Sequence, residues 1–162
     1  MKRIILVCLV SLSFSCSKAV YKKSFFTLGT LVNLTLVTSE DLAVKTSEMV
    51  KNEFQRIENR FSPYKKQSEI VKINSLAVGN KIQTTSEMIS LIKISKEISK
   101  QTNGAFDISF APLGDIWNYE KKPFIPPPQA LIAETKKMIN FKNIKVVSNK
   151  YIKLSRGMKL GL

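Results

Sequence analysis

The chain has 162 residues, of which 44% are apolar, so it can build the core of one ordinary domain and is not a disordered tail. Its 26 basic and 12 acidic residues give a formal charge of +14, which fits nucleic acid, anionic lipid or a phosphate-rich ligand as partner, or simply a solvated basic surface. Histidine is absent, which excludes Ser-His-Asp and Cys-His nucleophiles, His-ligated zinc and an imidazole base.

The first residues have the pattern of a secretion signal. Lys2-Arg3 precedes an apolar run over residues 4–12, which is too short to span a bilayer. The run leads into Ser13-Phe14-Ser15-Cys16, which resembles a lipoprotein processing site with small residues ahead of a cysteine that takes the lipid. An ordinary secretory signal and a buried N-terminal strand are the alternatives. We expect a signal peptide over residues 1–15 and lipidation at Cys16.

Both cysteines lie in this leader. Because Cys8 and Cys16 fall within the first sixteen residues, the folded part has no thiol for a disulfide framework. A basic tether over residues 16–23 is expected to follow, where lysines gain from anionic lipid. These features predict a protein that is lipid-anchored on the extracytoplasmic, periplasm-facing side of a bacterial membrane.

The folded part is expected to begin with strand structure and a long helix. Alternating apolar residues predict a strand within residues 25–37, interrupted at Gly29-Thr30. Ser39 is placed to cap a helix with an acidic first turn. A buried stripe is expected on this helix at Val50, Phe54, Ile57 and Phe61.

Two more helices are predicted downstream. A short one starts at Ser68-Glu69 and reaches Asn74. After a turn at Gly79-Asn80, residues 84–87 have the spacing of a capping box, and the helix that they start should end at Asn103-Gly104. Its expected buried face consists of Met88, Leu91, Ile92 and Ile98.

The last third combines a stiff loop, a helix and a hairpin. Prolines between residues 123 and 128 predict an extended loop, and residues 129–138 predict a helix. Residues 143–154 read as a hairpin, and a further strand begins at Met158. The helix is expected to turn Leu131, Ile132 and Met138 inward. The fold class is therefore α+β, with a mostly antiparallel sheet and packed helices.

One segment resembles a known family. Thr102-Asn103-Gly104-Ala105-Phe106-Asp107, followed by Ala111-Pro112-Leu113 and Trp117, is similar to the signature of the FAD:protein FMN transferases, the ApbE-type lipoproteins. In that family Thr-Asp-Gly-Ala-Phe-Asp leads to Gly-Pro-Leu and Leu-Trp in the same order and spacing. Leu28-Gly29-Thr30 is similar to the family's Met-Gly-Thr, and residues 61–69 to its Ser-x-Tyr loop and Ser-Glu pair.

The resemblance runs from about Phe25 to Leu162 and has four departures inside it. They are Leu28 for Met, Asn103 for Asp, Ala111 for Gly and Gly161 where Asp is usual. The family's Gly-Gly-Ile-Ala-Lys-Gly turn is missing. We therefore expect residues 24–162 to be the N-terminal portion of a flavin transferase-like domain that is truncated before this turn.

The resemblance implies a reaction and a ligand. Family members move FMN from FAD onto a threonine or serine hydroxyl of a secreted or membrane protein, with magnesium neutralising phosphate charge, and some instead hydrolyse FAD to FMN and AMP. The implied FAD contacts are Leu28, Tyr64, Ala105, Phe106 and Asp107. Taken alone, Tyr64 would be an ordinary surface residue, Phe106 a core residue and Asn103-Gly104 a helix stop.

No metal ligand or catalytic residue is carried over. Asp107 and Asp115 are available, but the family's magnesium residues are expected beyond Leu162, so activity is expected to be incomplete in this chain. The alternative is a non-catalytic lipoprotein that binds flavin or serves as an interaction module. A nucleic-acid binder is disfavoured because no glycine-aromatic module or helix-turn-helix pattern is present.

Overall fold

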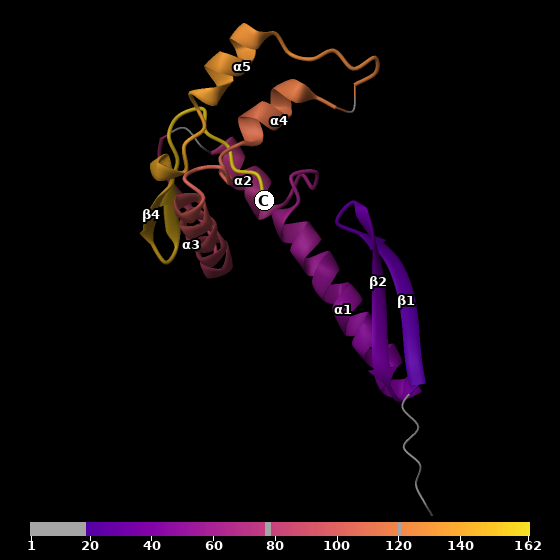
Figure 1. Cartoon of the computed structure of the whole chain (residues 1–162). Coiled ribbons are helices and arrows are strands. Elements are labelled where there is room, and N and C mark those ends of the chain that lie inside the picture. The colour runs from indigo at the N-terminus through magenta and orange to yellow at the C-terminus, as the bar shows by residue number, and fades with distance from the viewer. Residues whose placement is uncertain (1–18, 77–78, 120) are drawn as a thin grey trace, which may run out of the picture. The chain divides into compact units, whose positions relative to one another are not determined.

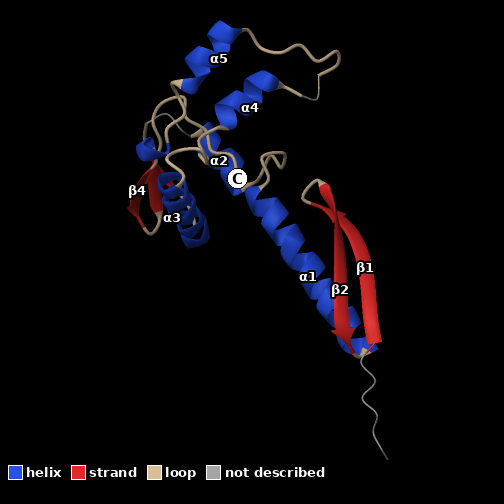
Figure 2. Cartoon of the chain, viewed as in Figure 1, coloured by secondary structure: helices blue, strands red, loops and turns tan. Residues whose placement is uncertain are grey.

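The structure, a computed structural model, describes residues 19–76, 79–119 and 121–162 (Figure 1). It divides into two compact units, residues 1–55 and residues 56–162. The expected signal peptide and Cys16 lie outside the described residues. Five helices accompany strands that pair antiparallel in both sheets, so the α+β prediction is confirmed for the described part of the chain (Figure 2).

A two-stranded hairpin opens the first unit. Strand β1 (Ala19–Thr27) pairs along its whole length with β2 (Thr30–Thr38). The turn residues Leu28 and Gly29 have φ of 51° and 71°, the left-handed pair that a type I′ two-residue turn requires. The interruption predicted at Gly29-Thr30 is therefore real but begins one residue earlier. The tether expected over residues 16–23 overlaps β1, because residues 19–23 pair with the end of β2.

Helix α1 (Glu40–Phe61) contacts the hairpin through polar groups and through aromatic rings. Lys23 Nζ lies 2.5 Å from a Glu48 carboxylate oxygen, and the rings of Phe25 and Phe54 meet edge to face at 5.8 Å. The predicted stripe is only half-buried, and the fully buried residues of the helix are Ala43 and Ser47. A ribbon of two strands covers a narrow part of a helix, so large side chains extend past it.

The second unit contains the remaining elements. They are α2 (Glu69–Ser75), β3 (Lys81–Gln83), α3 (Ser86–Gln101), α4 (Ala111–Trp117), α5 (Gln129–Lys136), the 3-10 helix η1 (Phe141–Asn143), β4 (Lys145–Ser148) and β5 (Tyr151–Lys153). The three strands form a sheet in the order β3-β5-β4. The three predicted helices and the hairpin are present. Strand β3 and helix α4 are not predicted by the sequence pattern, since one has three residues and the other begins at a proline segment.

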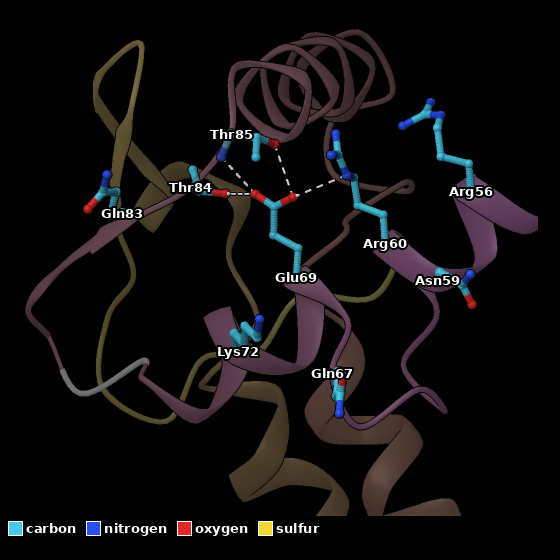
Figure 3. A pocket seen from close by; sticks show the side chains of 9 residues that line it. All are labelled: Arg56, Asn59, Arg60, Gln67, Glu69, Lys72, Gln83, Thr84 and Thr85. Carbon is cyan, nitrogen blue, oxygen red and sulfur yellow. Dashed lines mark hydrogen bonds and ion pairs between the residues drawn. The ribbon is translucent and has the colours of Figure 1, made fainter. Parts of the chain in front are cut away.

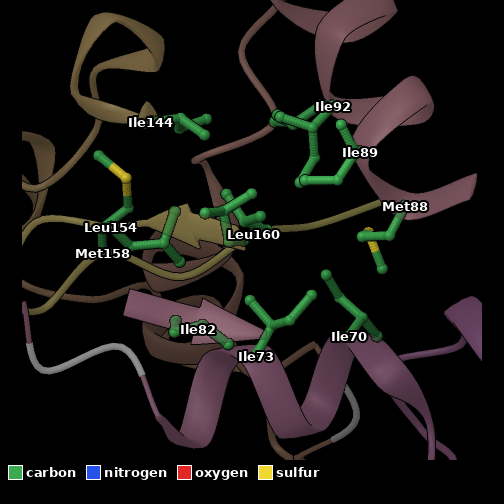
Figure 4. Packing of buried hydrophobic residues seen from close by; sticks show 12 residues of the cluster. Ile70, Ile73, Ile82, Met88, Ile89, Ile92, Ile144, Leu154, Met158 and Leu160 are labelled. Carbon is green, nitrogen blue, oxygen red and sulfur yellow. The ribbon is translucent and has the colours of Figure 1, made fainter. Parts of the chain in front are cut away.

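One apolar core holds this unit together. Its side chains come from α2, α3, the inner face of the sheet and the C-terminal segment, and they converge in Figure 4. The buried members are Ile70, Ile73, Ile82, Met88, Ile89, Ile92, Ile108, Ile144, Ile152, Leu154, Met158 and Leu160.

Some residues expected to be buried are exposed. On α3 the buried residues are Met88, Ile89, Ile92, Ser95 and Ser99, whereas Ile98 is turned outward and is 40% exposed. On α5 the buried residue is Thr135, whereas Leu131 is exposed, as is Met138 just beyond the helix. Small hydroxyl residues take the covered positions because their side chains bond within the helix, as Thr135 Oγ1 does by donating to the Leu131 carbonyl at 2.8 Å.

The C-terminal segment is held by a side chain rather than by a strand ladder. The Asn74 amide donates to the Leu160 carbonyl at 2.9 Å and accepts from the Leu160 N–H at 2.8 Å. Gly161 N–H donates to the Ile108 carbonyl at 2.8 Å, and Lys159 forms an isolated bridge with Phe110. The strand expected from Met158 is thus reduced to one bridge.

Candidate functional site

The end of α3 fixes the backbone of the first candidate segment. Gly104 N–H donates to the Ser99 carbonyl at 2.7 Å and Asn103 N–H to the Lys100 carbonyl at 3.1 Å, the bond pair of a Schellman cap. Asn103 and Gly104 both have positive φ, 51° and 85°. The predicted helix stop is therefore confirmed, and it turns the chain sharply into residues 105–107.

Thr102 holds the following loop. Its hydroxyl donates to the Ile98 carbonyl at 2.9 Å and accepts from Phe106 N–H at 3.1 Å, while Ala105 N–H donates to the Thr102 carbonyl at 3.0 Å. The backbone N–H groups of Ala105 and Phe106 are thus engaged inside the loop. The Phe106 ring is 42% exposed, so this loop offers an aromatic surface rather than backbone donors.

Asp107 anchors the loop to a distant part of the chain. One carboxylate oxygen accepts from Ser109 N–H at 2.8 Å and from Ser109 Oγ at 2.6 Å, and the other accepts from Phe141 N–H at 2.8 Å. Ser109 Oγ in turn accepts from Asn140 N–H at 2.9 Å. Three internal donors therefore occupy the carboxylate that the resemblance assigns to FAD contact, which leaves room for one further donor at most.

A pocket of about 420 Å³ lies beside this network. Its walls are the cap of α3, the Asp107 carboxylate and the segment that leads into η1. The lining residues are Lys100, Asn103, Gly104, Asp107, Ile139, Asn140, Phe141 and Lys142. Two lysines and one carboxylate make the pocket positive, which suits a phosphate-bearing ligand.

The other candidate residues lie elsewhere. Tyr64 is in the loop between α1 and α2, where its N–H donates to Ser62 Oγ at 3.3 Å and its side chain is 82% exposed. Leu28 forms the tip of the hairpin in the first unit and is half exposed. The structure thus brings Ala105, Phe106 and Asp107 together in one loop and places the other two on separate loops.

A second pocket, of about 600 Å³, is built around Glu69 (Figure 3). One carboxylate oxygen accepts from Thr85 N–H at 2.7 Å and from the Thr84 hydroxyl, and the other accepts from Thr85 Oγ1 at 3.0 Å. Arg60 Nε lies 3.7 Å from the same carboxylate. Glu69 is therefore held by three hydrogen bonds and an ion pair within the chain itself.

This arrangement corrects the predicted capping box. The N-cap of α3 is Thr85, whose side chain accepts from Met88 N–H, and the acid that receives Thr85 N–H is Glu69 of α2 instead of Glu87. Glu87 instead binds Arg56 and Arg60. The hydrogen bond from Arg56, with Arg60 also close, holds the pKa of Glu87 below its ordinary value.

Sequence reasoning missed most of the lining of both pockets. Phe141 N–H reaches Asp107 and Asn140 N–H reaches Ser109 across more than thirty positions, which no local pattern indicates. The Asp107-x-Ser109 spacing is typical of a side chain that accepts from a backbone N–H two residues on, so the internal role of Asp107 had a local signal. Arg60 had none.

Comparison with known proteins identifies the family. Residues 28–162 match the model of the ApbE family. The chain is 28% identical over 120 residues to the FAD:protein FMN transferase of Buchnera aphidicola, with 70% of this chain and 35% of that protein covered. It is 26% identical over 109 residues to the FAD:protein FMN transferase of Haemophilus influenzae, with 65% of this chain and 32% of that protein covered.

Solved structures give the same result for the fold. The ApbE protein from Thermotoga maritima superposes with a TM-score of 0.80 and 27% identity, covering 89% of this chain and 47% of that one. The Pseudomonas stutzeri flavinyl transferase ApbE superposes with a TM-score of 0.77 and 18% identity, and the match covers 90% of this chain and 50% of that one. The chain spans about a third of the length of the curated relatives and half that of the solved structures. The match over most of its length shows that the chain belongs to the ApbE family.

Proposed function

We propose that this chain supplies a flavin-nucleotide-binding part of an FAD:protein FMN transferase, which moves FMN from FAD onto a threonine or serine hydroxyl of a target protein. The observation that carries the proposal is the ApbE family match over residues 28–162. The exposed rings of Tyr64 and Phe106 support it, because aromatic faces on loops suit stacking against planar ligand rings. The lysines beside Asp107 support it through their positive charge.

Magnesium dependence is part of the proposal, but the described residues do not fit a resident magnesium site. Within residues 19–76, 79–119 and 121–162, no three acidic, cysteine or histidine side chains are grouped to hold a metal. Asp107 and Glu69 already accept hydrogen bonds from the chain. No catalytic step is therefore assigned to a metal held by these residues.

The test is FAD titration of the full chain, followed by flavin fluorescence. Tyr64→Ala and Phe106→Ala should each weaken binding about tenfold, since stacking on an aromatic side chain contributes roughly 1–3 kcal/mol. Tyr119→Ala is the control, because it removes an exposed ring that already stacks on Trp117 and Phe124 and that lies outside the proposed site. Absence of FAD binding by the chain, or equal losses in all three variants, would contradict the proposed site.

FMN transfer is tested separately. The protein is incubated with FAD, magnesium chloride and a candidate secreted or membrane acceptor, and covalent flavin is read by in-gel fluorescence and by the acceptor's mass. The proposal expects acceptor labelling that requires a threonine or serine hydroxyl. FAD binding with release of FMN and AMP would instead indicate a hydrolase, and binding without turnover a flavin-binding lipoprotein.

We also propose that Cys16 carries a lipid that holds the protein on the extracytoplasmic side of a bacterial membrane. The supporting observation is the signal-like run that ends at Cys16. None of the described helices is both long and apolar enough to cross a bilayer. Cys16→Ser should remove the protein from membranes washed at high salt, which strips charge-dependent binding, whereas Cys8→Ser should leave it there. Equal behaviour of the two variants would contradict lipidation at Cys16.

A further inference from the structure

The three-stranded sheet has an outer face of unusual charge. Lys81 of β3 lies directly opposite Lys153 of β5, and Lys153 lies directly opposite Lys145 of β4. All three are exposed. We call these three residues the lysine row. Neighbouring strands are about 4.8 Å apart, so the three side chains leave the sheet within about 10 Å.

Nothing in the described part of the chain neutralises the lysine row. No residue of β3, β4 or β5 is acidic, and the next rung across the sheet is Gln83, Tyr151 and Ser148. Lys23, Lys137 and Lys159 each pair with a carboxylate, but the described residues provide no such partner to the row. Like charges directly opposite each other destabilise a sheet, so the row works against the fold.

The opposite side of the sheet explains why the row points outward. Ile82 and Ile152 alternate with the lysines and are buried in the core of the second unit, with Val146 packed against them. Because strand side chains alternate, a core on one face fixes the lysines on the other. The core therefore fixes the backbone positions from which the three positive side chains leave the sheet.

We propose that the outer face of the β3-β5-β4 sheet is a docking surface for a bilayer of anionic phospholipid. The charge is complementary, and the chain as a whole carries +14. All three row residues are lysines, whose flexible point charges suit mobile lipid phosphates. Arginine is instead preferred where a fixed phosphate is bound through two parallel hydrogen bonds. Tyr151 lies beside Lys153 and is 37% exposed, and tyrosine favours membrane–water interfaces.

The proposal is tested with two variants of equal charge. The row variant is Lys81→Gln/Lys145→Gln/Lys153→Gln. The control is Lys45→Gln/Lys93→Gln/Lys136→Gln, three exposed lysines spread over α1, α3 and α5. Both changes reduce the formal charge from +14 to +11. Each is made in the full chain with Cys16→Ser, so that no lipid anchor contributes.

Binding is measured by cosedimentation with vesicles of equal parts phosphatidylcholine and phosphatidylglycerol. The parent chain should bind these vesicles and release them as salt rises, and should bind phosphatidylcholine alone only weakly. The row variant should lose about a hundredfold in partition coefficient, on the order of fivefold per lysine, and the control only a few-fold. The row variant should unfold at no lower urea concentration than the parent, because removing like charges relieves repulsion.

Three results would overturn the proposal. Equal losses in the row and control variants would mean that bulk charge alone acts. Absence of binding to anionic vesicles would remove the partner. Row-dependent retention of double-stranded DNA that is tighter than vesicle binding at the same salt would assign the face to nucleic acid instead. The readout contains neither FAD nor an acceptor, so it is independent of flavin transfer.

Discussion

The two units of the chain are stabilised by different means. In residues 56–162, twelve apolar side chains form one buried cluster. In the described part of residues 1–55, Ala43 is the one apolar side chain that is fully buried, and the hairpin depends on cross-strand pairs and on contacts with α1. A two-stranded ribbon alone is marginally stable in water. Changes of sequence should therefore be felt much more strongly in the second unit.

A matched pair of truncations provides the strongest test of this contrast. Ile152 is fully buried between β3 and β4, whereas Leu36 of β2 is half-buried. Ile152→Ala should lower the free energy of unfolding by about 2–5 kcal/mol, and Leu36→Ala by at most about 2 kcal/mol. Urea unfolding measures both. Equal losses would mean that the hairpin is buried as deeply as the core, contrary to the comparison.

Replacement of Asp107 tests whether its hydrogen bonds stabilise the second unit. Asp107→Ala leaves the N–H groups of Ser109 and Phe141 without their acceptor, so a loss of about 2–4 kcal/mol is expected. Asp115→Ala is the control, because it removes an exposed ion pair with Lys159 and should cost less than about 1 kcal/mol. Thermal unfolding compares them. A loss as small as that of the control would contradict the anchoring role of Asp107.

A substitution at Gly161 tests how tightly the C-terminal segment is packed. A methyl group there would lie 2.7 Å from the Phe110 ring, and Gly161→Ala should cost about 1–3 kcal/mol. Phe110→Val should recover most of that loss, which a double-mutant cycle in urea would show as a coupling energy. Additive effects would mean that the two residues do not touch. A larger side chain at position 161 would require the Phe110 ring to move.

The smallest expected effect is a pH dependence from Glu87. Its pKa is lowered in the folded chain, chiefly by the hydrogen bond from Arg56, so its stabilising contribution is present above the ordinary value near 4.5 and is lost as pH falls further. Because the group is exposed, the change is at most about 1 kcal/mol. Glu87→Gln should flatten this part of the stability curve. An unchanged acid limb in the variant would exclude Glu87 as its source.

The sequence predicted the fold best where a pattern is local. Ser68, Asn103 and Gly104 mark helix ends through bonds within a few residues, and the structure places those ends within about a residue. Strand β3 could not be predicted in this way. Its three residues become a strand only because β5, almost seventy positions later, pairs with them.

The candidate site was predicted less completely than the fold. Family resemblance found the loop of Ala105, Phe106 and Asp107, but it did not show that Asp107 is occupied by Ser109 and Phe141. The predicted buried face of α3 failed at Ile98 because a shift of one residue rotates a helix by about 100°. Periodicity alone fixes a helical stripe less exactly than packing requires.

The position of Glu69 has a consequence for the order of folding. Its carboxylate stands at the first residue of α2 and also receives the backbone N–H that begins α3. One side chain thus joins the starts of two helices, so we expect neither start to be fixed in the folding transition state without the other. Glu69→Gln and Thr85→Ala weaken the contact from its two sides. Their φ-values, the change in the activation free energy of folding divided by the change in stability, should then be equal.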